Sequence, residues 1–183
     1  MRRILARLPV TVKSAMPAVV VSEYRAPFGA LAIAARGDVL VAIHLEGHPE
    51  RLAKEWARRE PVERGPLTPA LTRAFDAYFN GDIRAIEALE ADPAGTAFQL
   101  EVWAELRRIR AGTALSYSQL AARIGRPDAV RAVGTANGAN PVPIVIPCHR
   151  VIGANGSLVG YGGGLDMKRW LLAHEGLIPG RLW

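Results

Sequence analysis

The sequence predicts an α+β protein in which a sheet-containing N-terminal half precedes a mostly helical C-terminal half. Short β-like runs separated by turn residues fill the start of the first half, which indicates a small antiparallel sheet. Helical periodicity dominates the second half, and the turn-rich segment 90–96 (EADPAGT) separates the two patterns. We therefore expect an N-terminal α+β domain over residues 1–93 and a helical C-terminal domain over residues 94–183.

The first half contains strand patterns followed by helix patterns. The strands are expected over residues 18–24, 30–34 and 39–45. Two helices are expected over residues 49–59 and 68–79. In the second of these, Leu71, Phe75 and Tyr78 recur at helical spacing before Asn80 and Gly81 end the pattern. These elements together predict a sheet with helices packed on it.

A third helical pattern opens the second half. Phe98, Val102, Leu106 and Ile109 follow one another at the spacing that places side chains on a single helix face. We expect that face to be buried against the rest of the C-terminal domain.

Two short helices joined by a tight turn come next. Ser116 and Gln119 have the spacing of a capping box, and Gly125 suits the end of the helix that they open. A second helix is expected over residues 127–138, because Pro127 favours a first turn. This is the arrangement of a helix-turn-helix motif.

The second helix offers two interpretations. Val130 and Val133 can face the core, whereas the opposite side is expected to carry Ala129, Arg131, Ala132, Thr135 and Ala136. Small side chains allow close approach to DNA, and a single long one, Arg131, favours sequence-independent binding in the minor groove over base reading in the major groove. A plain αα-hairpin inside a core gives the same pattern, so the residues alone leave both interpretations open.

The charge of the chain is uneven. The formal net charge is +6, of which residues 94–183 contribute +5 and residues 1–93 contribute +1. A basic half favours a polyanionic partner such as nucleic acid, although a solvated basic surface is the alternative.

The composition limits the class of protein. No run approaches the roughly twenty uncharged apolar residues that a membrane span needs. The basic and apolar start is interrupted by Pro9, Lys13 and Pro17, so we interpret it as an irregular terminus of a cytoplasmic protein and not as a signal peptide. One cysteine and four scattered histidines show no zinc-binding spacing, and we expect no metal site.

The single cysteine ends an apolar run, NPVPIVIPCHRVIG, over residues 140–153. A thiol reacts as the thiolate, and the neighbouring His149 and Arg150 would supply local positive charge that favours this form. Cys148 is therefore a candidate nucleophile. A lone cysteine is more often buried packing, and this alternative stays open on the residues alone.

A resemblance to a known family extends over most of the second half. PCHRVIG (147–153) resembles the active-site signature of the O6-alkylguanine-DNA alkyltransferases, also called methylated-DNA–protein-cysteine methyltransferases. Further segments resemble this family in the same order, namely GTAFQLEVW, SYSQLAARIG, RAVGTANGANPVPIV and GYGGGLDMKRWLLAHEG. The first half resembles it weakly, through EYRAPFGALAI and AFDAYFNGD, and the family implies a ribonuclease H-like sheet with helices there.

The resemblance implies a reaction and its catalytic residues. Cys148 would accept an alkyl group from O6 of guanine in DNA, and also from O4 of thymine, irreversibly and once per molecule. His149 would remove the thiol proton through a water molecule, and Glu175 would orient this histidine. Asn140 would brace the turn before the cysteine.

The resemblance also implies residues that bind DNA and the target base. Tyr117 would crowd the phosphate of the target nucleotide, and Arg131 would fill the stack after the base has rotated out. The pocket for the base would include Pro143, Val151, Tyr161 and Gly162. Tyr161 would serve the N3 side of the leaving guanine, and Lys168 would lie near the site.

The implied partner is double-stranded DNA, without a cofactor or a membrane, and the protein is expected to be a monomer in the bacterial cytoplasm. The sequence departs from commoner family patterns at Arg110, Asn137 and Ala154, which affects the expected adduct range and one phosphate contact. Some relatives lack the cysteine and only recognise damage, and Cys148 argues against that alternative. Regulators in this family carry an additional cysteine-rich domain, for which this chain is too short and too poor in cysteine.

Overall fold

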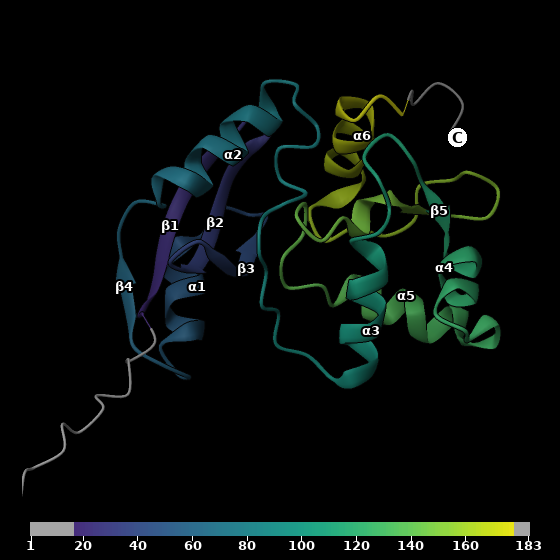
Figure 1. Cartoon of the computed structure of the whole chain (residues 1–183), viewed down its shortest axis with the longest axis horizontal. Coiled ribbons are helices and arrows are strands. Elements are labelled where there is room, and N and C mark those ends of the chain that lie inside the picture. Colours follow the sequence, from purple (N-terminus) through teal and green to yellow (C-terminus); the bar gives the residue numbers. More distant parts are fainter. Residues whose placement is uncertain (1–16, 178–183) are drawn as a thin grey trace, which may run out of the picture.

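The computed structural model describes residues 17–177 (Figure 1). The predicted irregular terminus over residues 1–16 lies outside this range. A four-stranded sheet of order β3-β2-β1-β4 underlies the N-terminal part, residues 17–93. Its strands are β1 (Val19–Ala26), β2 (Gly29–Arg36), β3 (Val39–His44) and β4 (Val62–Arg64).

The antiparallel pairs β1–β2 and β2–β3 confirm the three predicted strands. The fourth strand, β4, was not predicted, and it pairs in parallel with β1. A strand of three residues is too short to show the alternation by which strands are recognised. The sheet is therefore mixed and not purely antiparallel.

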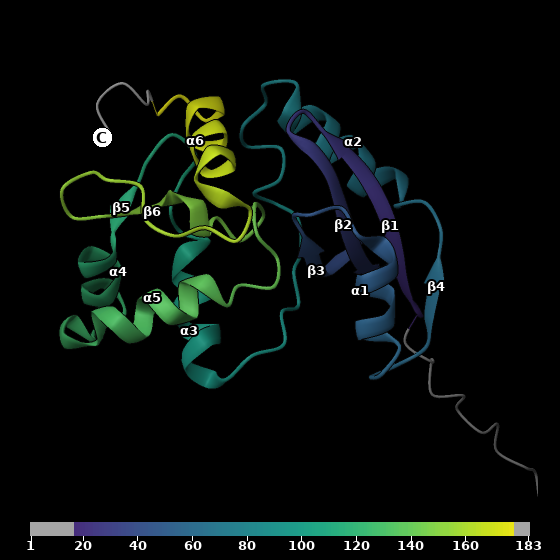
Figure 2. The same ribbon diagram turned by 180° about the vertical axis from the view of Figure 1, so that it is seen from behind.

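Helices cover both faces of the sheet, as the two views in Figures 1 and 2 show. Helix α1 (Pro49–Trp56) packs Leu52 and Trp56 on the face that carries Ala32 and Ala34. Helix α2 (Pro69–Phe79) packs on the opposite face. The middle of strand β2, residues 31–35, is apolar and buried because helices cover both faces of the sheet there.

The predicted linker is partly held by the sheet. In the segment 90–96, the carbonyl of Glu90 accepts from the amide of Leu40 at 2.9 Å, and the amide of Asp92 donates to the carbonyl of Leu40 at 2.9 Å. The connection between the two parts therefore begins along the edge of β3.

The C-terminal part, residues 94–177, is mainly helical, as predicted. Its longer elements are α3 (Ala97–Leu106), α4 (Tyr117–Arg123), α5 (Val130–Gly138) and α6 (Gly164–His174). Its short elements are β5 (Leu115–Ser116), β6 (Val151–Ile152) and the 3-10 turns η1 (Pro127–Ala129) and η2 (Cys148–Arg150). The predicted capping box of Ser116 and Gln119 is confirmed at the start of α4.

The second helix of the motif differs from the prediction in two ways. It begins as the turn η1 and becomes α-helical only at Val130. Ala136, predicted on the outer side, is only 3% exposed, because α3 packs there and the indole of Trp103 donates to the carbonyl of Ala136 at 2.8 Å. Val133 is buried, as predicted.

The two parts share one hydrophobic core. The amide of Ile43 at the sheet edge donates to the carbonyl of Pro141 at 2.8 Å. Aromatic rings of α2 contact rings of α6, with 6.1 Å between the centroids of Phe79 and Trp170. The sheet therefore supports the C-terminal part directly. None of the helices within residues 17–177 is both long enough and apolar enough to cross a bilayer.

Substitution of two glycines by alanine tests the backbone conformation of the helix-turn-helix. Gly125 follows α4 with φ +71°, whereas Gly138 lies in α5, and a Cβ at either position would meet open space. Gly125→Ala should lower the free energy of unfolding by about 1–2 kcal/mol, because an alanine is strained in the left-handed region. Gly138→Ala should raise it by about 0.5–1 kcal/mol, because the helical backbone suits alanine. Urea denaturation measures both values, and equal effects would contradict this backbone geometry.

Candidate active site

A tight loop between α5 and η2 delivers Cys148. The side-chain amide of Asn140 donates to the carbonyl of Ile146 at 2.7 Å, and its carbonyl oxygen accepts from the amide of Val142 at 3.0 Å. Asn140 thus ties both ends of the loop, as expected for a brace. The Cys148 amide in turn donates to the carbonyl of Ile146 at 2.8 Å.

The loop contains a strained residue. Ile144 has φ 75°, and among residues 17–177 no other non-glycine residue has a positive φ. This conformation is costly for a β-branched side chain, and it persists only where the surroundings enforce it. Here the side chain of Ile144 is fully buried in the core. The loop therefore holds a fixed and tightly folded shape in front of the cysteine.

Cys148 lines a cavity of about 280 Å³. The walls come from Tyr117 and α5, from the loop around Asn140 and Pro143, from the glycine-rich segment 160–162, and from Leu45 of the N-terminal part. The cysteine is 6% exposed, so its thiol is reached only through this cavity. The volume is near the lower end for small-molecule sites, about 300 Å³.

His149 follows the cysteine and is completely buried. Its Nε2 lies 3.0 Å from Oε1 of Glu175, which assigns the ring proton to Nε2 and leaves Nδ1 as an acceptor. Nδ1 is buried and has no hydrogen-bond partner among the described residues. Burial lowers the pKa of His149 more than Glu175 raises it, so the ring is neutral and able to accept a proton.

Glu175 lies just after α6 and is 2% exposed. Arg150 donates to both carboxylate oxygens at 2.8 Å, and the hydroxyl of Tyr78 donates to Oε1 at 2.9 Å. Burial by itself would raise the pKa of Glu175, but His149 and Arg150 together lower the pKa to about 2. The carboxylate is therefore ionised and receives several hydrogen bonds.

The surroundings of the thiol correct one expectation. Burial raises the pKa of Cys148, opposed by Asn140 and by the charge of Lys168. The cation that favours the thiolate is thus Lys168 and not Arg150, whose guanidinium binds Glu175 and the carbonyl of Ile109. At neutral pH the thiol keeps its proton, so its reaction requires a base.

Lys168 is buried, where a solvated lysine would be usual. Its Nζ donates to the carbonyls of Val151 and Val159 at 2.6 and 2.7 Å. Burial lowers the pKa of Lys168 to about 8. Val151 was predicted to line the base pocket, but it is fully buried and is not among the residues that line the cavity.

The other residues predicted for the base pocket, Pro143, Tyr161 and Gly162, do line the cavity. Tyr117, predicted to crowd the phosphate of the target nucleotide, lines it as well. The hydroxyl of Tyr161 is buried and has no hydrogen-bond partner among the described residues. Arg131 lies outside the cavity, exposed on α5, and no ion pair joins it to another described residue. The structure therefore separates a buried reactive site from an exposed arginine.

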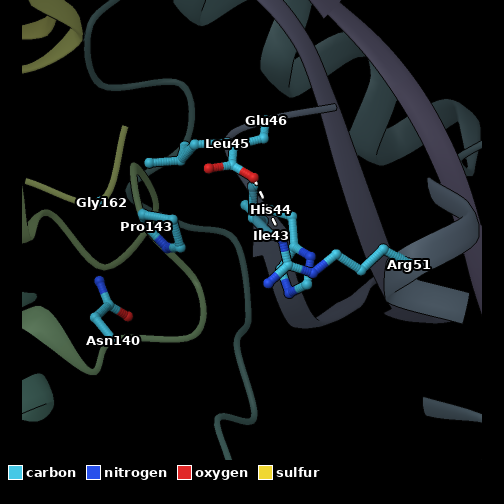
Figure 3. Close-up of a pocket in the computed structure, with 8 residues that line it drawn as sticks. All are labelled: Ile43, His44, Leu45, Glu46, Arg51, Asn140, Pro143 and Gly162. Carbon is cyan, nitrogen blue, oxygen red and sulfur yellow. Dashed lines mark hydrogen bonds and ion pairs between the residues drawn. The ribbon is translucent and has the colours of Figure 1, made fainter. Parts of the chain in front are cut away.

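A second cavity of about 220 Å³ adjoins the first (Figure 3). Ile43, His44, Leu45, Glu46 and Arg51 line it from the N-terminal part, and Arg51 pairs with Glu46 at 3.4 Å. The residues that line both cavities are Leu45, Asn140, Pro143 and Gly162. The wall of the reactive site is thus shared with the end of β3, which was not predicted.

Several polar residues of the site were missed or misinterpreted. Tyr78 was assigned only to a helix face, and Arg150 only to local charge. Asn137 was noted as a departure, and its buried Oδ1 has no hydrogen-bond partner within the described range. The position of Arg150 beside His149 was an available signal, whereas Tyr78 is 97 residues from its partner Glu175. No group of three or more His, Cys, Asp or Glu within residues 17–177 could hold a metal ion.

The carboxyl of Glu175 should stay ionised far into the acid range. Its pKa of about 2 in the folded chain is below the ordinary value of 4.5. The ionised group therefore stabilises the fold above about pH 4.5, by on the order of 3 kcal/mol, and this stabilisation is lost as the pH falls towards 2. A carbon-13 NMR titration of the carboxyl measures the pKa, and a midpoint near 4.5 would contradict the assigned network.

Comparison with known proteins identifies the family. Residues 19–93 match the family model "6-O-methylguanine DNA methyltransferase, ribonuclease-like domain", and residues 97–177 match "6-O-methylguanine DNA methyltransferase, DNA binding domain". A methylated-DNA–protein-cysteine methyltransferase of Salmonella typhimurium is 51% identical over 131 residues, which cover 70% of this chain and 77% of the relative.

Solved structures agree with the sequence matches. A Mycobacterium tuberculosis OGT in complex with DNA has a TM-score of 0.73 and 37% identity, with 90% of this chain and 98% of that chain covered. A second structure, the O6-methylguanine methyltransferase of the same organism, has a TM-score of 0.71 and 39% identity, with 90% and 97% covered. These matches confirm the α+β fold class with a ribonuclease-like sheet domain. The chain belongs to the methylated-DNA–protein-cysteine methyltransferase family, the O6-alkylguanine-DNA alkyltransferases.

Proposed function

We propose that this protein repairs O6-alkylguanine, and also O4-alkylthymine, in double-stranded DNA by transferring the alkyl group irreversibly to Cys148. The observation that carries the proposal is the placement of Cys148 in the wall of a partly open cavity, directly before a buried histidine paired with a carboxylate. Membership of the family supplies the substrate class, since the matched relatives and domain models are those of 6-O-methylguanine DNA methyltransferases.

DNA would bind to the helix-turn-helix, α4 and α5, on the minor-groove side. The target base must leave the stack, because an atom inside a duplex cannot reach a thiol at the bottom of a cavity. Tyr117, at the start of α4, would press on the backbone of the target nucleotide, and the exposed Arg131 would take the place of the base. The Mycobacterium tuberculosis relative, whose structure was solved in complex with DNA, supports DNA as the partner.

The transfer is a displacement at the alkyl carbon. The sulfur of Cys148 forms a bond to this carbon while the bond to O6 of guanine breaks and its electron pair moves onto the base. The thiol proton passes through a water molecule to Nδ1 of His149, and the Glu175 carboxylate stabilises the imidazolium that results. The hydroxyl of Tyr161 donates to the N3 side of the leaving guanine.

The remaining site residues would position these groups. Asn140 keeps the loop in shape, and the ammonium of Lys168 favours the thiolate. Pro143 and Gly162 would contact the base, and the buried Val151 would support the site through its carbonyl, which holds Lys168. The reaction balances without a cofactor, because the substrate brings the alkyl group and the protein is its acceptor.

We further propose that residues 1–93 form the supporting domain and residues 94–183 the domain for DNA binding and transfer. The protein would act as a monomer in the bacterial cytoplasm, where its DNA substrate lies. Bacterial relatives support this location.

A single transfer per molecule is the first test of this function. The protein, incubated with excess duplex containing one O6-methylguanine, should gain the mass of one methylene group and then stop, because a thioether is too stable to hydrolyse. Intact-protein mass spectrometry measures the gain, and Cys148→Ala should show none. Turnover beyond one alkyl group per chain would contradict the mechanism. Lesion-selective binding without any gain would favour a damage-recognition protein instead.

Arg131 should matter only when a base must leave a duplex. Arg131→Ala should slow repair of O6-methylguanine in duplex DNA by about tenfold or more, because a few kcal/mol of unstacking then goes uncompensated. The variant should react with free O6-benzylguanine within about twofold of the wild type.

The matched control for this test is Arg73→Ala, which removes one exposed arginine from α2 instead of α5. It should leave both rates unchanged. Equal losses of Arg131→Ala on duplex and free base would rule out the proposed role of Arg131.

A further inference from the structure

Tyr78 reaches the active-site carboxylate from the N-terminal part. It lies near the end of α2, is completely buried, and its hydroxyl donates to Oε1 of Glu175 at 2.9 Å. Helix α2 packs on the sheet of the N-terminal part, whereas Glu175 follows α6 of the C-terminal part (Figure 1). This hydrogen bond therefore joins the two parts of the chain at the catalytic network.

The contact is made by a firmly held side chain. The Tyr78 ring meets the ring of Phe79 edge-on at 5.1 Å and that of His174 at 5.0 Å. The backbone carbonyl of Tyr78 lies 2.7 Å from Nε2 of His174, the residue directly before Glu175. Two consecutive residues at the end of α6 are thus fixed by one residue of α2.

The same carboxylate oxygen serves Tyr78 and His149. Oε1 of Glu175 is 2.9 Å from the Tyr78 hydroxyl and 3.0 Å from Nε2 of His149, and Arg150 donates to it as well. Donors from three directions prevent the carboxylate from rotating. Because burial raises the pKa of Tyr78, its hydroxyl keeps the proton and remains a donor throughout the working pH range.

We propose that Tyr78 is a positioning residue for alkyl transfer, whose hydroxyl holds Glu175 in the orientation that presents Nδ1 of His149 to the thiol proton. This inference rests on the proposed function, and it assigns to the N-terminal part a role in the reaction beyond support. Without the hydroxyl, one buried lone pair of Glu175 loses its donor, and the carboxylate can turn away from the imidazole.

The test uses Tyr78→Phe in the full chain, with free O6-benzylguanine as the substrate so that DNA binding does not enter. The variant keeps the ring and removes only the hydroxyl. At neutral pH its rate of transfer should fall by about tenfold, as expected for a lost hydrogen bond to a charged group. The deficit should narrow as the pH rises, because direct ionisation of the thiol replaces the histidine relay.

Tyr24→Phe is the matched control. Tyr24 lies in β1, and its hydroxyl donates to Asp76 at 2.8 Å and not to Glu175. Asp76 belongs to α2, the helix that also contains Tyr78. Its loss should leave the rate unchanged. Replacing Tyr78 by 4-aminophenylalanine restores a donor on the same ring and should restore most of the rate. Circular dichroism at the assay temperature establishes that each variant is folded.

Three results would overturn the assignment: an unchanged rate in Tyr78→Phe, the same loss at every pH, or no recovery with the amino analogue. If Tyr78→Phe proves too unstable to assay, the protein with 4-aminophenylalanine at position 78 still tests the proposal. A folded analogue protein that reacts as slowly as Glu175→Gln would overturn it. A wild-type protein that fails to take the methyl group from O6-methylguanine in duplex DNA would instead refute the proposed function itself.

Discussion

The buried carboxylate of Glu175 is the interaction on which the active site depends. An ionised group inside a protein is tolerated only when hydrogen bonds and an opposite charge replace its water. Glu175 receives them from Arg150, His149 and Tyr78, which belong to η2 and α2. Removing any donor would leave part of a buried charge unsatisfied. The helix α6, the turn with the cysteine and the sheet layer are therefore held in one arrangement.

The same arrangement determines the protonation state of the Cys148 thiol, which can accept only one alkyl group. Burial keeps the thiol of Cys148 protonated, and a thiol is a much weaker nucleophile than a thiolate. The imidazole beside it is neutral and able to take the proton. The cysteine therefore stays a thiol until a base removes its proton, and an electrophile reaches it only through the cavity. The charge of Lys168 limits the rise in the pKa of the Cys148 thiol that burial causes.

Sequence patterns predicted what is local in the chain. Strands β1, β2 and β3, the capping box of Ser116 and the placement of Asn140 before Cys148 depend on neighbouring residues, so spacing and motif were sufficient. Ala136 was placed on the wrong side because the indole that packs there comes from α3. Arg150 was interpreted as a charge for the thiol, although the acid that neutralises it lies 25 residues away.

The shape of the reactive cavity could not be predicted for the same reason. It forms at the seam between the sheet edge and the cysteine loop, where the amide of Ile43 binds the carbonyl of Pro141 and Leu45 closes the wall. No periodicity in either half indicates that these segments meet. The shared core and the shared cavity wall place the N-terminal part in direct contact with the loop that presents Cys148. The N-terminal part therefore helps to shape the reactive cavity, together with the loop that contains the nucleophile.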